Sequence, residues 1–248
     1  MRYSHCMRRS TRWYNVVSSA LDLYAKVEDL LGVDEVTPIL NEHYYETLDG
    51  LEFKRLLDVG CGSGGFLAEV KRRYPNVDAM GIDLSPVMVE LTQAKGLKAQ
   101  CIDLCKLEEK YDVITAIFDM VNYLDDKQLR RFLRCIEERL EKGGYFIFDI
   151  NTLYAFKVVA AGSFIKDGGD RFVTIDSDYE EEEGIYYMDF TLFEQNQEGC
   201  FEKSQDEIMQ YYHTVSKIQK LSNLKLVRKK PIAIYGDEVE KFYLVFKR

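Results

Sequence analysis

A glycine-rich decapeptide constrains the fold of this chain more than any other stretch. Residues 56–65 read LLDVGCGSGG, so an apolar run ends in an aspartate and is followed by four closely spaced glycines. A buried parallel strand that gives way to a tight turn and then to a helix has this pattern. Glycine lets the backbone approach a ligand closely, and the free N–H groups that open the next helix attract negative charge. The stretch therefore predicts a ligand-binding loop at the end of a strand.

Two classes of cofactor fit such a loop, and a structural turn without a ligand is a third interpretation. Gly60, Gly62 and Gly65 satisfy the G-x-G-x-x-G spacing of dinucleotide-binding proteins. Asp58 places a carboxylate two residues before the first glycine, where it would repel a pyrophosphate. The same carboxylate suits a ligand that carries an ammonium or a sulfonium group. The glycine spacing alone does not discriminate between these interpretations, but the charge of Asp58 favours a cationic ligand.

Segments typical of strands and of helices alternate from this loop to about residue 150. Further strands are expected at 77–82, 97–102, 111–118 and 145–150, and helices at 66–74, from Pro86 to just before Gly96, and at 126–140. Ser85 precedes Pro86 as an N-cap residue does. Alternation of this kind implies right-handed βαβ units and a parallel sheet with helices on both faces. The predicted fold class is therefore doubly wound α/β.

Four of the expected strands end in an aspartate: Asp58, Asp83, Asp103 and Asp119. The carboxyl ends of parallel strands meet at one edge of the sheet, and open α/β sheets bind their ligands there. Four carboxylates at one edge repel one another unless a ligand supplies hydrogen-bond donors and positive charge. The pattern predicts a cationic ligand at this edge.

The run Asp58-Val59-Gly60-Cys61-Gly62-Ser63-Gly64 resembles the first motif of the class I S-adenosylmethionine-dependent methyltransferases. The resemblance implies a seven-stranded, mostly parallel sheet with an antiparallel hairpin at one edge, and S-adenosyl-L-methionine as cofactor. It further implies that Asp83 binds the ribose hydroxyls, that Asp103 binds the adenine amino group, and that Asp119 and the carbonyl of Phe118 hold the methionine ammonium. No metal is expected. The cofactor-binding residues implied are Asp58, Gly60, Cys61, Gly62, Gly64, Asp83, Leu84, Asp103, Leu104 and Phe118.

Residues 119–124, DMVNYL, are similar to a segment of a bacterial subgroup that resembles enzymes acting on small molecules. That subgroup also continues strand five as FDINT, here at 148–152, and carries a β insertion after it. The similarity implies methyl transfer to an oxygen or nitrogen atom of a small molecule. Asp119, Asn122 and Tyr123 are the candidate catalytic residues, because they directly follow the fourth strand. Met120 and Val121 stand where DNA amino-methyltransferases have two prolines.

The resemblance divides the chain into three parts. Residues 1–50 would form an N-terminal helical cap, 51–150 with 214–248 the cofactor-binding domain, and 151–213 an inserted antiparallel β flap. Aromatic residues of the cap would either line the acceptor pocket or pack against the core. They are Trp13, Tyr14, His43, Tyr44 and Tyr45.

A general base is needed only if the acceptor loses a proton. His43 and His213 are further candidates for it, and Asn151 is a candidate polar contact. His213 could equally cap a helix that starts at Thr214.

Composition sets the remaining expectations. The 248 residues are 46% hydrophobic and 30% charged, with a formal net charge of -9, which is typical of a soluble globular protein and argues against a nucleic-acid-binding surface. No apolar segment is long enough to span a bilayer, so we expect a cytoplasmic monomer or homodimer with a small-molecule substrate and no membrane partner. Six cysteines without a C-x-x-C pair are expected as free thiols: Cys6, Cys61, Cys101, Cys105, Cys135 and Cys200.

Three alternatives stay open at this point. Lys225, Arg228, Lys229 and Lys230 would suit an RNA or protein methyltransferase, although charged residues also protect an edge strand from pairing. A nucleotide-binding dehydrogenase would use the loop for NAD, against the charge of Asp58. A non-catalytic protein would bind S-adenosylmethionine without transferring its methyl group.

Overall fold

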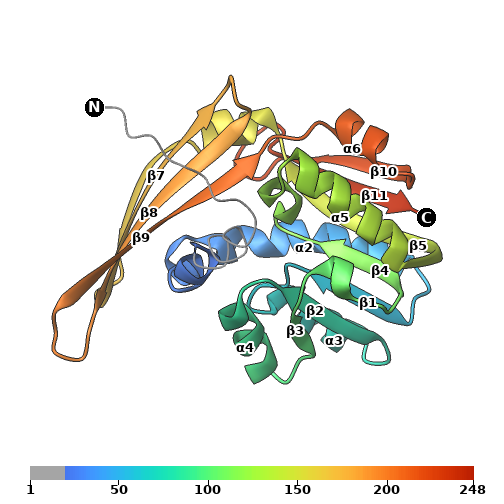
Figure 1. Ribbon diagram of the computed structural model, residues 1–248, viewed down its shortest axis with the longest axis horizontal. Helices are drawn as coiled ribbons and strands as arrows, with labels where there is room; N and C mark the ends of the chain where they lie inside the picture. The colour runs from blue at the N-terminus through green and yellow to red at the C-terminus, as the bar shows by residue number, and fades with distance from the viewer. Residues whose placement is uncertain (1–19) are drawn as a thin grey trace.

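The computed structural model describes residues 20–248, which form two β-sheets and the helices packed against them (Figure 1). The larger sheet has seven strands in the order β10-β11-β5-β4-β1-β2-β3. Strands β1 to β5 are parallel, β11 is antiparallel to β5, and β10 is antiparallel to β11. This confirms the predicted α/β class and its antiparallel edge hairpin. The strands are β1 Arg55–Val59, β2 Asp78–Asp83, β3 Ala99–Cys101, β4 Tyr111–Ala116, β5 Leu140–Asn151, β10 Lys225–Ile232 and β11 Lys241–Lys247.

Helices cover both faces of this sheet because neighbouring strand residues point to opposite sides. Leu56 and Val113 face the cluster formed with α2 (Val33–Asp49) and α3 (Gly65–Arg73). Leu57 and Ile114 face the cluster formed with α5 (Asp126–Arg139) and α6 (Val215–Leu221). The sheet is therefore doubly wound. The other helical segments are α4 Pro86–Ala94, the short turns η1 Glu28–Leu30, η2 Leu104–Lys106 and η3 Met120–Tyr123, and the π-helical η4 Ala155–Val159.

The smaller sheet, which we call the flap, lies beside the larger one (Figure 1). Its four antiparallel strands are β6 Gly162–Asp167, β7 Arg171–Glu180, β8 Ile185–Gln195 and β9 Phe201–Tyr211. One face packs Val173, Phe190 and Ile208 against Leu23 and Val27, and residues 20–25 are helical. The N-terminal segment therefore joins the flap through a shared hydrophobic cluster. The division into three domains stays a prediction.

Local chemistry explains where several elements begin and end. Ser85 caps α4 as predicted, with its hydroxyl accepting from Met88 N at 3.2 Å. Helix α5 ends at Arg139, and β5 begins at Leu140, before the glycines expected to end the helix. Strand β4 ends at Ala116, two residues earlier than expected, because Phe118 and Asp119 have φ values of 57° and 51°. Strand β6 was not recognised in the sequence.

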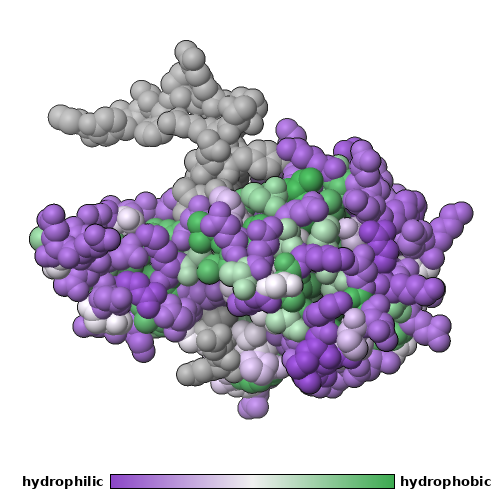
Figure 2. All heavy atoms as spheres, turned by 90° about the horizontal axis from the view of Figure 1, so that it is seen from below, coloured by the Kyte–Doolittle hydropathy of each residue, from purple (hydrophilic) through white to green (hydrophobic). Residues whose placement is uncertain are grey.

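The face of the molecule that carries α4 has hydrophilic side chains around its margin and hydrophobic ones gathered in its middle (Figure 2). Leu84, Val87 and Leu91 are among the exposed large hydrophobic residues. Among residues 20–248, no helix is both long and apolar enough to cross a membrane.

Candidate active site

The glycine loop joins β1 to α3 at the carboxyl edge of the larger sheet. Gly60, Gly62 and Gly64 have φ values of 73°, 53° and 80°, a left-handed conformation that glycine adopts without strain. A Cβ on Gly60 would lie 2.6 Å from Cγ of Met120, in the turn after β4. A Cβ on Gly62 would meet no described atom within 4 Å. The loop is therefore packed tightly at Gly60 and leaves space for a ligand at Gly62.

Asp58 lies beneath this loop and is fully buried. Its Oδ1 accepts a hydrogen bond from Thr115 Oγ1 at 2.7 Å, while its Oδ2 has no partner among the described residues. Burial raises the pKa of Asp58 to about 7, although the Thr115 bond favours the ionised form. A buried carboxylate oxygen without a partner is costly. Asp58 therefore fits a ligand that brings a donor or a positive charge.

Asp83, at the end of β2, stabilises the loop from the other side. Its Oδ2 accepts from Gly62 N at 3.0 Å and its Oδ1 from Ser85 N at 2.9 Å. Burial raises the pKa of Asp83 despite these bonds. Ser85 Oγ also donates to the carboxylate of Asp22, on the N-terminal helical segment. The N-terminal segment therefore reaches the rim of the loop.

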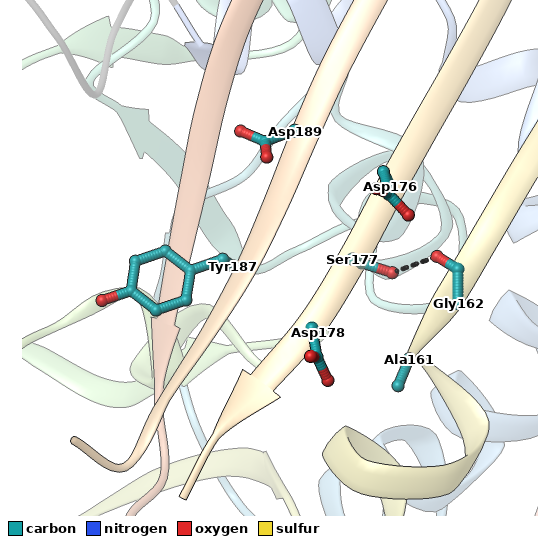
Figure 3. A pocket seen from close by; sticks show the side chains of 7 residues that line it. All are labelled: Ala161, Gly162, Asp176, Ser177, Asp178, Tyr187 and Asp189. Atoms are coloured by element: carbon teal, nitrogen blue, oxygen red, sulfur yellow. Dashed lines mark hydrogen bonds between the residues drawn. The ribbon is translucent and has the colours of Figure 1, made fainter. Parts of the chain in front are cut away.

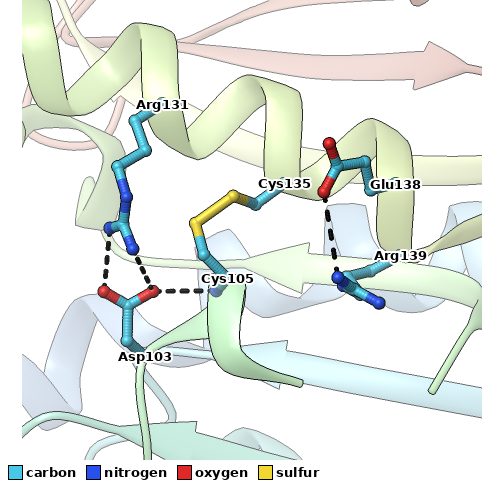
Figure 4. Close-up of a disulfide and its surroundings, with 6 residues drawn as sticks. All are labelled: Asp103, Cys105, Arg131, Cys135, Glu138 and Arg139. Carbon is cyan, nitrogen blue, oxygen red and sulfur yellow. Dashed lines mark hydrogen bonds and ion pairs between the residues drawn. A yellow bond between two sulfur atoms is a disulfide. The ribbon is translucent and has the colours of Figure 1, made fainter. Parts of the chain in front are cut away.

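Asp103 follows β3 and is held by two elements (Figure 4). Its Oδ1 accepts from Cys105 N at 2.8 Å, and its Oδ2 lies 2.8 Å from Nη1 of Arg131 on α5. Arg131 Nη2 also donates to Oδ1, at 3.3 Å, so the guanidinium contacts both carboxylate oxygens. Arg131 was not anticipated, and its effect is to fix the direction of the Asp103 side chain.

The expectation that all cysteines are free thiols is wrong for two of them. Cys105 and Cys135 form a disulfide, with their Cα atoms 5.2 Å apart (Figure 4). The pair is 30 residues apart in sequence and meets only because η2 packs against α5, so no spacing motif reveals it. Cys61, Cys101 and Cys200 are free.

Asp119 lies in the turn after β4 and is bonded on both oxygens. Its Oδ1 is 2.5 Å from Nζ of Lys241, at the start of β11, and its Oδ2 accepts from Gln210 Nε2 of β9 at 2.6 Å. Lys241 Nζ also lies 2.9 Å from Oδ2 of Asp149 on β5. Asp149 Oδ1 in turn accepts from the Tyr44 hydroxyl at 2.6 Å. Four elements besides the turn itself therefore meet at this cluster.

Asn122 and Tyr123 follow in η3 and differ in their surroundings. The Asn122 amide is fully buried: its Nδ2 donates to Tyr211 O at 2.8 Å, and its Oδ1 accepts from Asn151 N at 2.9 Å. Tyr123 packs against the flap cluster, where burial and the charge of Asp119 raise its pKa well above the usual value. Asn122 therefore connects η3 to two strands, whereas Tyr123 lies beside the Asp119 carboxylate.

Comparison with known proteins agrees with this geometry. Residues 56–144 match the family of methyltransferase domains. Residues 56–144 are a methyltransferase domain, and the chain has the fold of solved S-adenosylmethionine-dependent methyltransferases.

A malonyl-acyl-carrier protein O-methyltransferase of Bacillus cereus is 24% identical over 219 residues, 83% of this chain and 77% of the relative. A solved S-adenosylmethionine-dependent methyltransferase from Clostridium acetobutylicum has a TM-score of 0.74 and 22% identity, covering 92% of this chain and 98% of its own. An S-adenosylmethionine-bound amino pentose methyltransferase from Micromonospora echinaspora has a TM-score of 0.59 and 17% identity, covering 99% and 100%.

The residues of this methyltransferase fit S-adenosylmethionine, its cofactor. The unpartnered Oδ2 of Asp58 and the space beside Gly62 lie at the glycine loop, and Asp83 is bonded to that loop. Individual contacts with the cofactor stay predictions. Leu84 is exposed, Phe118 is half-buried, and Cys61 and Leu104 are buried.

The aromatic residues considered for the acceptor pocket and the histidines considered as general bases have different surroundings in the structure. Tyr44 and Tyr45 are buried, with Tyr45 stacked on Phe66, so they pack in the core. His43 Nδ1 lies 3.0 Å from Nζ of Lys230 on β10. His213 is buried and does not cap α6, because its Nε2 donates to Leu124 O at 2.7 Å and the cap is Thr214. Trp13 and Tyr14 lie outside the described residues.

A shallow pocket of about 480 Å³ lies on the outer face of the flap (Figure 3). Asp176, Asp178, Tyr187 and Asp189 line it, and they alternate with the residues that face the N-terminal segment. The strand alternation therefore directs this pocket away from the face of the flap that packs on the rest of the methyltransferase. The described residues contain no group of three side chains suited to a metal ion.

Three residues of the Asp119 cluster were missed in the sequence: Asp149, Gln210 and Lys241. Asp149 lies within the FDINT segment, near the end of its strand like the four aspartates that were recognised. Gln210 and Lys241 carried no comparable signal, because each stands in a mixed β segment that reads as an ordinary strand.

Proposed function

We propose that this methyltransferase transfers the methyl group to an oxygen or nitrogen atom of a small-molecule acceptor bound beside Asp119. The observation that carries the proposal is the attachment of the flap over this turn. Gln210 Nε2 bonds to Asp119, and Tyr211 O accepts from Asn122, so consecutive residues of β9 cover η3. An enclosed site suits a small acceptor better than a macromolecule.

The N-terminal segment adds to this enclosure. Tyr24 packs against the same hydrophobic cluster as Tyr123 of η3, and burial and the carboxylates of Glu28 and Asp119 raise its pKa. Tyr24 also stacks edge-on against Phe190 of the flap, with ring centroids 6.1 Å apart. Malonyl-acyl-carrier protein and amino pentose methyltransferases are among the similar proteins, which supports an oxygen or nitrogen acceptor.

Direct displacement at a sulfonium-bound methyl group, which the cofactor supplies, requires alignment and exclusion of water more than acid–base chemistry. In our proposal Asp119 accepts a hydrogen bond from the N–H or O–H of the acceptor, and Tyr123 borders the acceptor. Asn122 positions η3 rather than touching the acceptor, because two backbone groups already use its amide. Flap and N-terminal segment exclude water.

The basic residues that suggested a nucleic-acid substrate do not form one surface. Arg228 Nη1 bonds to Thr47 of α2 at 3.2 Å, and Lys230 lies 3.7 Å from Glu46 of the same helix. Lys229 instead places its Nζ 4.0 Å from the ring centroid of Phe242. Alternate residues of the edge strand β10 thus point to opposite faces, which supports the edge-protection interpretation.

The test is a transfer assay with labelled S-adenosylmethionine and three separate acceptor pools: metabolites, RNA and proteins. We expect label in the metabolite pool, and a decrease of at least about 100-fold in Asp119→Asn, the lower range for a positioned acid–base group. Thermal unfolding of the variant, followed by circular dichroism, serves as the control for folding. Label confined to RNA or protein would overturn the proposal, and so would cofactor binding without transfer to any pool.

A further inference from the structure

Lys241 is an unusual lysine. It is 8% exposed, and its ammonium lies between the carboxylates of Asp119, at 2.5 Å, and Asp149, at 2.9 Å. Lysine is almost never buried unless it is paired. Truncating one partner of a buried ion pair is strongly destabilising, because the charge that remains has no compensation. One ammonium therefore balances two buried carboxylates.

The same cluster holds a strained stretch of backbone. Among the described residues, Phe118 and Asp119 are the non-glycine residues with positive φ, at 57° and 51°. Each such residue costs on the order of 1–3 kcal/mol and persists only where its surroundings hold it. Asp149 Oδ2 accepts from Asp119 N at 3.0 Å, and Lys241 holds the Asp119 side chain. The backbone of the turn is thus held by Asp149 and its side chain by Lys241, and these two residues are themselves ion-paired.

We propose that Lys241 is the positioning residue of the acceptor side: it keeps Asp119 ionised and holds the Phe118–Asp119 turn in place, so that the carboxylate can receive the N–H or O–H of the acceptor. This inference rests on the proposed role of Asp119. The bonds to Lys241 and Gln210 use one lone pair on each Asp119 oxygen and leave one on each for the acceptor.

The groups that face Asp119 come from every element around it. They are Lys241 on β11, Asp149 on β5, Gln210 on β9, Tyr123 in η3, Tyr24 on the N-terminal segment and Tyr186 on β8. Burial raises the pKa of Asp119, and Lys241 opposes that effect. The pKa of Lys241 is raised, because the two carboxylates outweigh its burial. Without the ammonium, two neighbouring buried carboxylates would not both ionise.

The first measurement is carbon NMR of the full chain labelled at aspartate Cγ, titrated with acid and base. Asp119→Asn assigns the signal. We expect the titration midpoint of Asp119 to rise by at least one pH unit in Lys241→Met and to stay unchanged in Lys241→Arg. Lys247→Met is the matched control, because Lys247 lies at the exposed end of the same strand. An unchanged midpoint in Lys241→Met would overturn the inference.

The double variant Lys241→Met/Asp149→Asn keeps the test decisive if Lys241→Met does not fold. Its reference is Asp149→Asn alone. Compared with that variant, the added loss of the ammonium should raise the Asp119 midpoint by at least one pH unit, because Lys241 attracts the ionised carboxylate and donates a hydrogen bond to it. Equal midpoints in Asp149→Asn and the double variant would contradict the role of Lys241.

Kinetics separate this inference from the proposed function. With an acceptor from the transfer screen, Lys241→Met should lower kcat/KM at least 30-fold, with S-adenosylhomocysteine affinity within threefold of the wild type, and Lys241→Arg should recover most of the loss. Full transfer by Asp119→Asn would refute the role of Asp119 whatever the NMR shows. An inactive Asp119→Asn beside a fully active Lys241→Met would refute the role of Lys241 alone.

Discussion

The proposed cofactor side and the proposed acceptor side of this site are assembled in opposite ways. On the cofactor side, Asp58, the glycine loop and Asp83 belong to one continuous β1-α3-β2 unit. On the acceptor side, Asp119 and its partner Lys241 are 122 residues apart, and Gln210 arrives from a different sheet. A continuous unit can be recognised as a motif, whereas a cluster gathered from distant strands exists only in the folded chain.

The two sides also differ in how many of their carboxylate oxygens already have a hydrogen-bond partner in the protein. Asp58 is buried with one oxygen lacking any described partner, so part of its hydrogen-bonding capacity is reserved for a ligand. Asp119 is bonded through both oxygens before any ligand arrives. The comparison suggests that the cofactor completes its side of the site, while the acceptor enters a side that is already organised.

The largest effect should come from filling the space beside Gly62. We expect Gly62→Val to reduce S-adenosylhomocysteine affinity at least about 100-fold, or roughly 2.7 kcal/mol, because the new side chain would occupy the open side of the loop. Calorimetric titration measures the loss.

Gly143→Val is the matched control for Gly62→Val. Gly143 also has a positive φ, at 81°, and open space around its Cβ position, so both variants carry similar backbone strain. Only Gly62→Val should lose the ligand. Retained affinity in Gly62→Val would mean that the cofactor does not approach this side of the loop, and the cofactor side would have to be reassigned.

A smaller effect is expected at Asp83. Replacing it with alanine should weaken S-adenosylhomocysteine binding by about 1.5–3 kcal/mol, the usual contribution of a hydrogen bond to a charged group. Asp78→Ala removes the same side chain from the exposed start of the same strand and should leave affinity unchanged.

Gln210→Ala sharpens the contrast between the two sides. It removes the flap bond to Asp119 and should leave S-adenosylhomocysteine affinity within about twofold, while methyl transfer falls. Comparable losses of affinity in Asp83→Ala and Gln210→Ala would show that the two sides are a single cooperative unit.

Most of the fold could be predicted from the sequence, because the patterns that indicate strands, turns and helices each lie within one element. The glycine loop, the Ser85-Pro86 cap and the apolar stripe of α5 each lie within one element, and each is where the spacing placed it. Strand ends were less accurate. The left-handed turn at Phe118 and Asp119 ends β4 early, and nothing in those two side chains reveals a conformation that distant contacts impose.

Residues whose partners are distant in the sequence could not be found from local sequence patterns. Cys105 and Cys135 were expected as free thiols, and their pairing depends on the packing of η2 against α5. Lys241 reads as one more charged residue at the start of a strand, although the fold buries it between two carboxylates. His213 was considered as a base or a cap, and the fold uses it to bond the carbonyl of Leu124.

The smallest effect, taken per pH unit, is a pH dependence that belongs to the cofactor side. The pKa of Asp58 is raised by burial from 3.8 to about 7 in the folded protein, so the folded state binds the proton more tightly than the unfolded state does. The free energy of unfolding should therefore decrease as the pH rises from about 4 to about 7, by at most about 1.4 kcal/mol per pH unit, and level off above that. Urea denaturation at several pH values measures this slope.

Asp58→Asn should make the slope shallower, because asparagine can still accept from Thr115 but cannot ionise. Asp83 keeps part of the slope, since burial raises its pKa in the same direction. Asp78→Asn is the control, because the pKa of that exposed carboxyl is lowered, chiefly by its hydrogen bond to Lys98. If Asp58→Asn retained the full slope, Asp58 would be ionised in the folded protein and would need no ligand. The contrast between an incomplete cofactor side and a completed acceptor side would then be wrong.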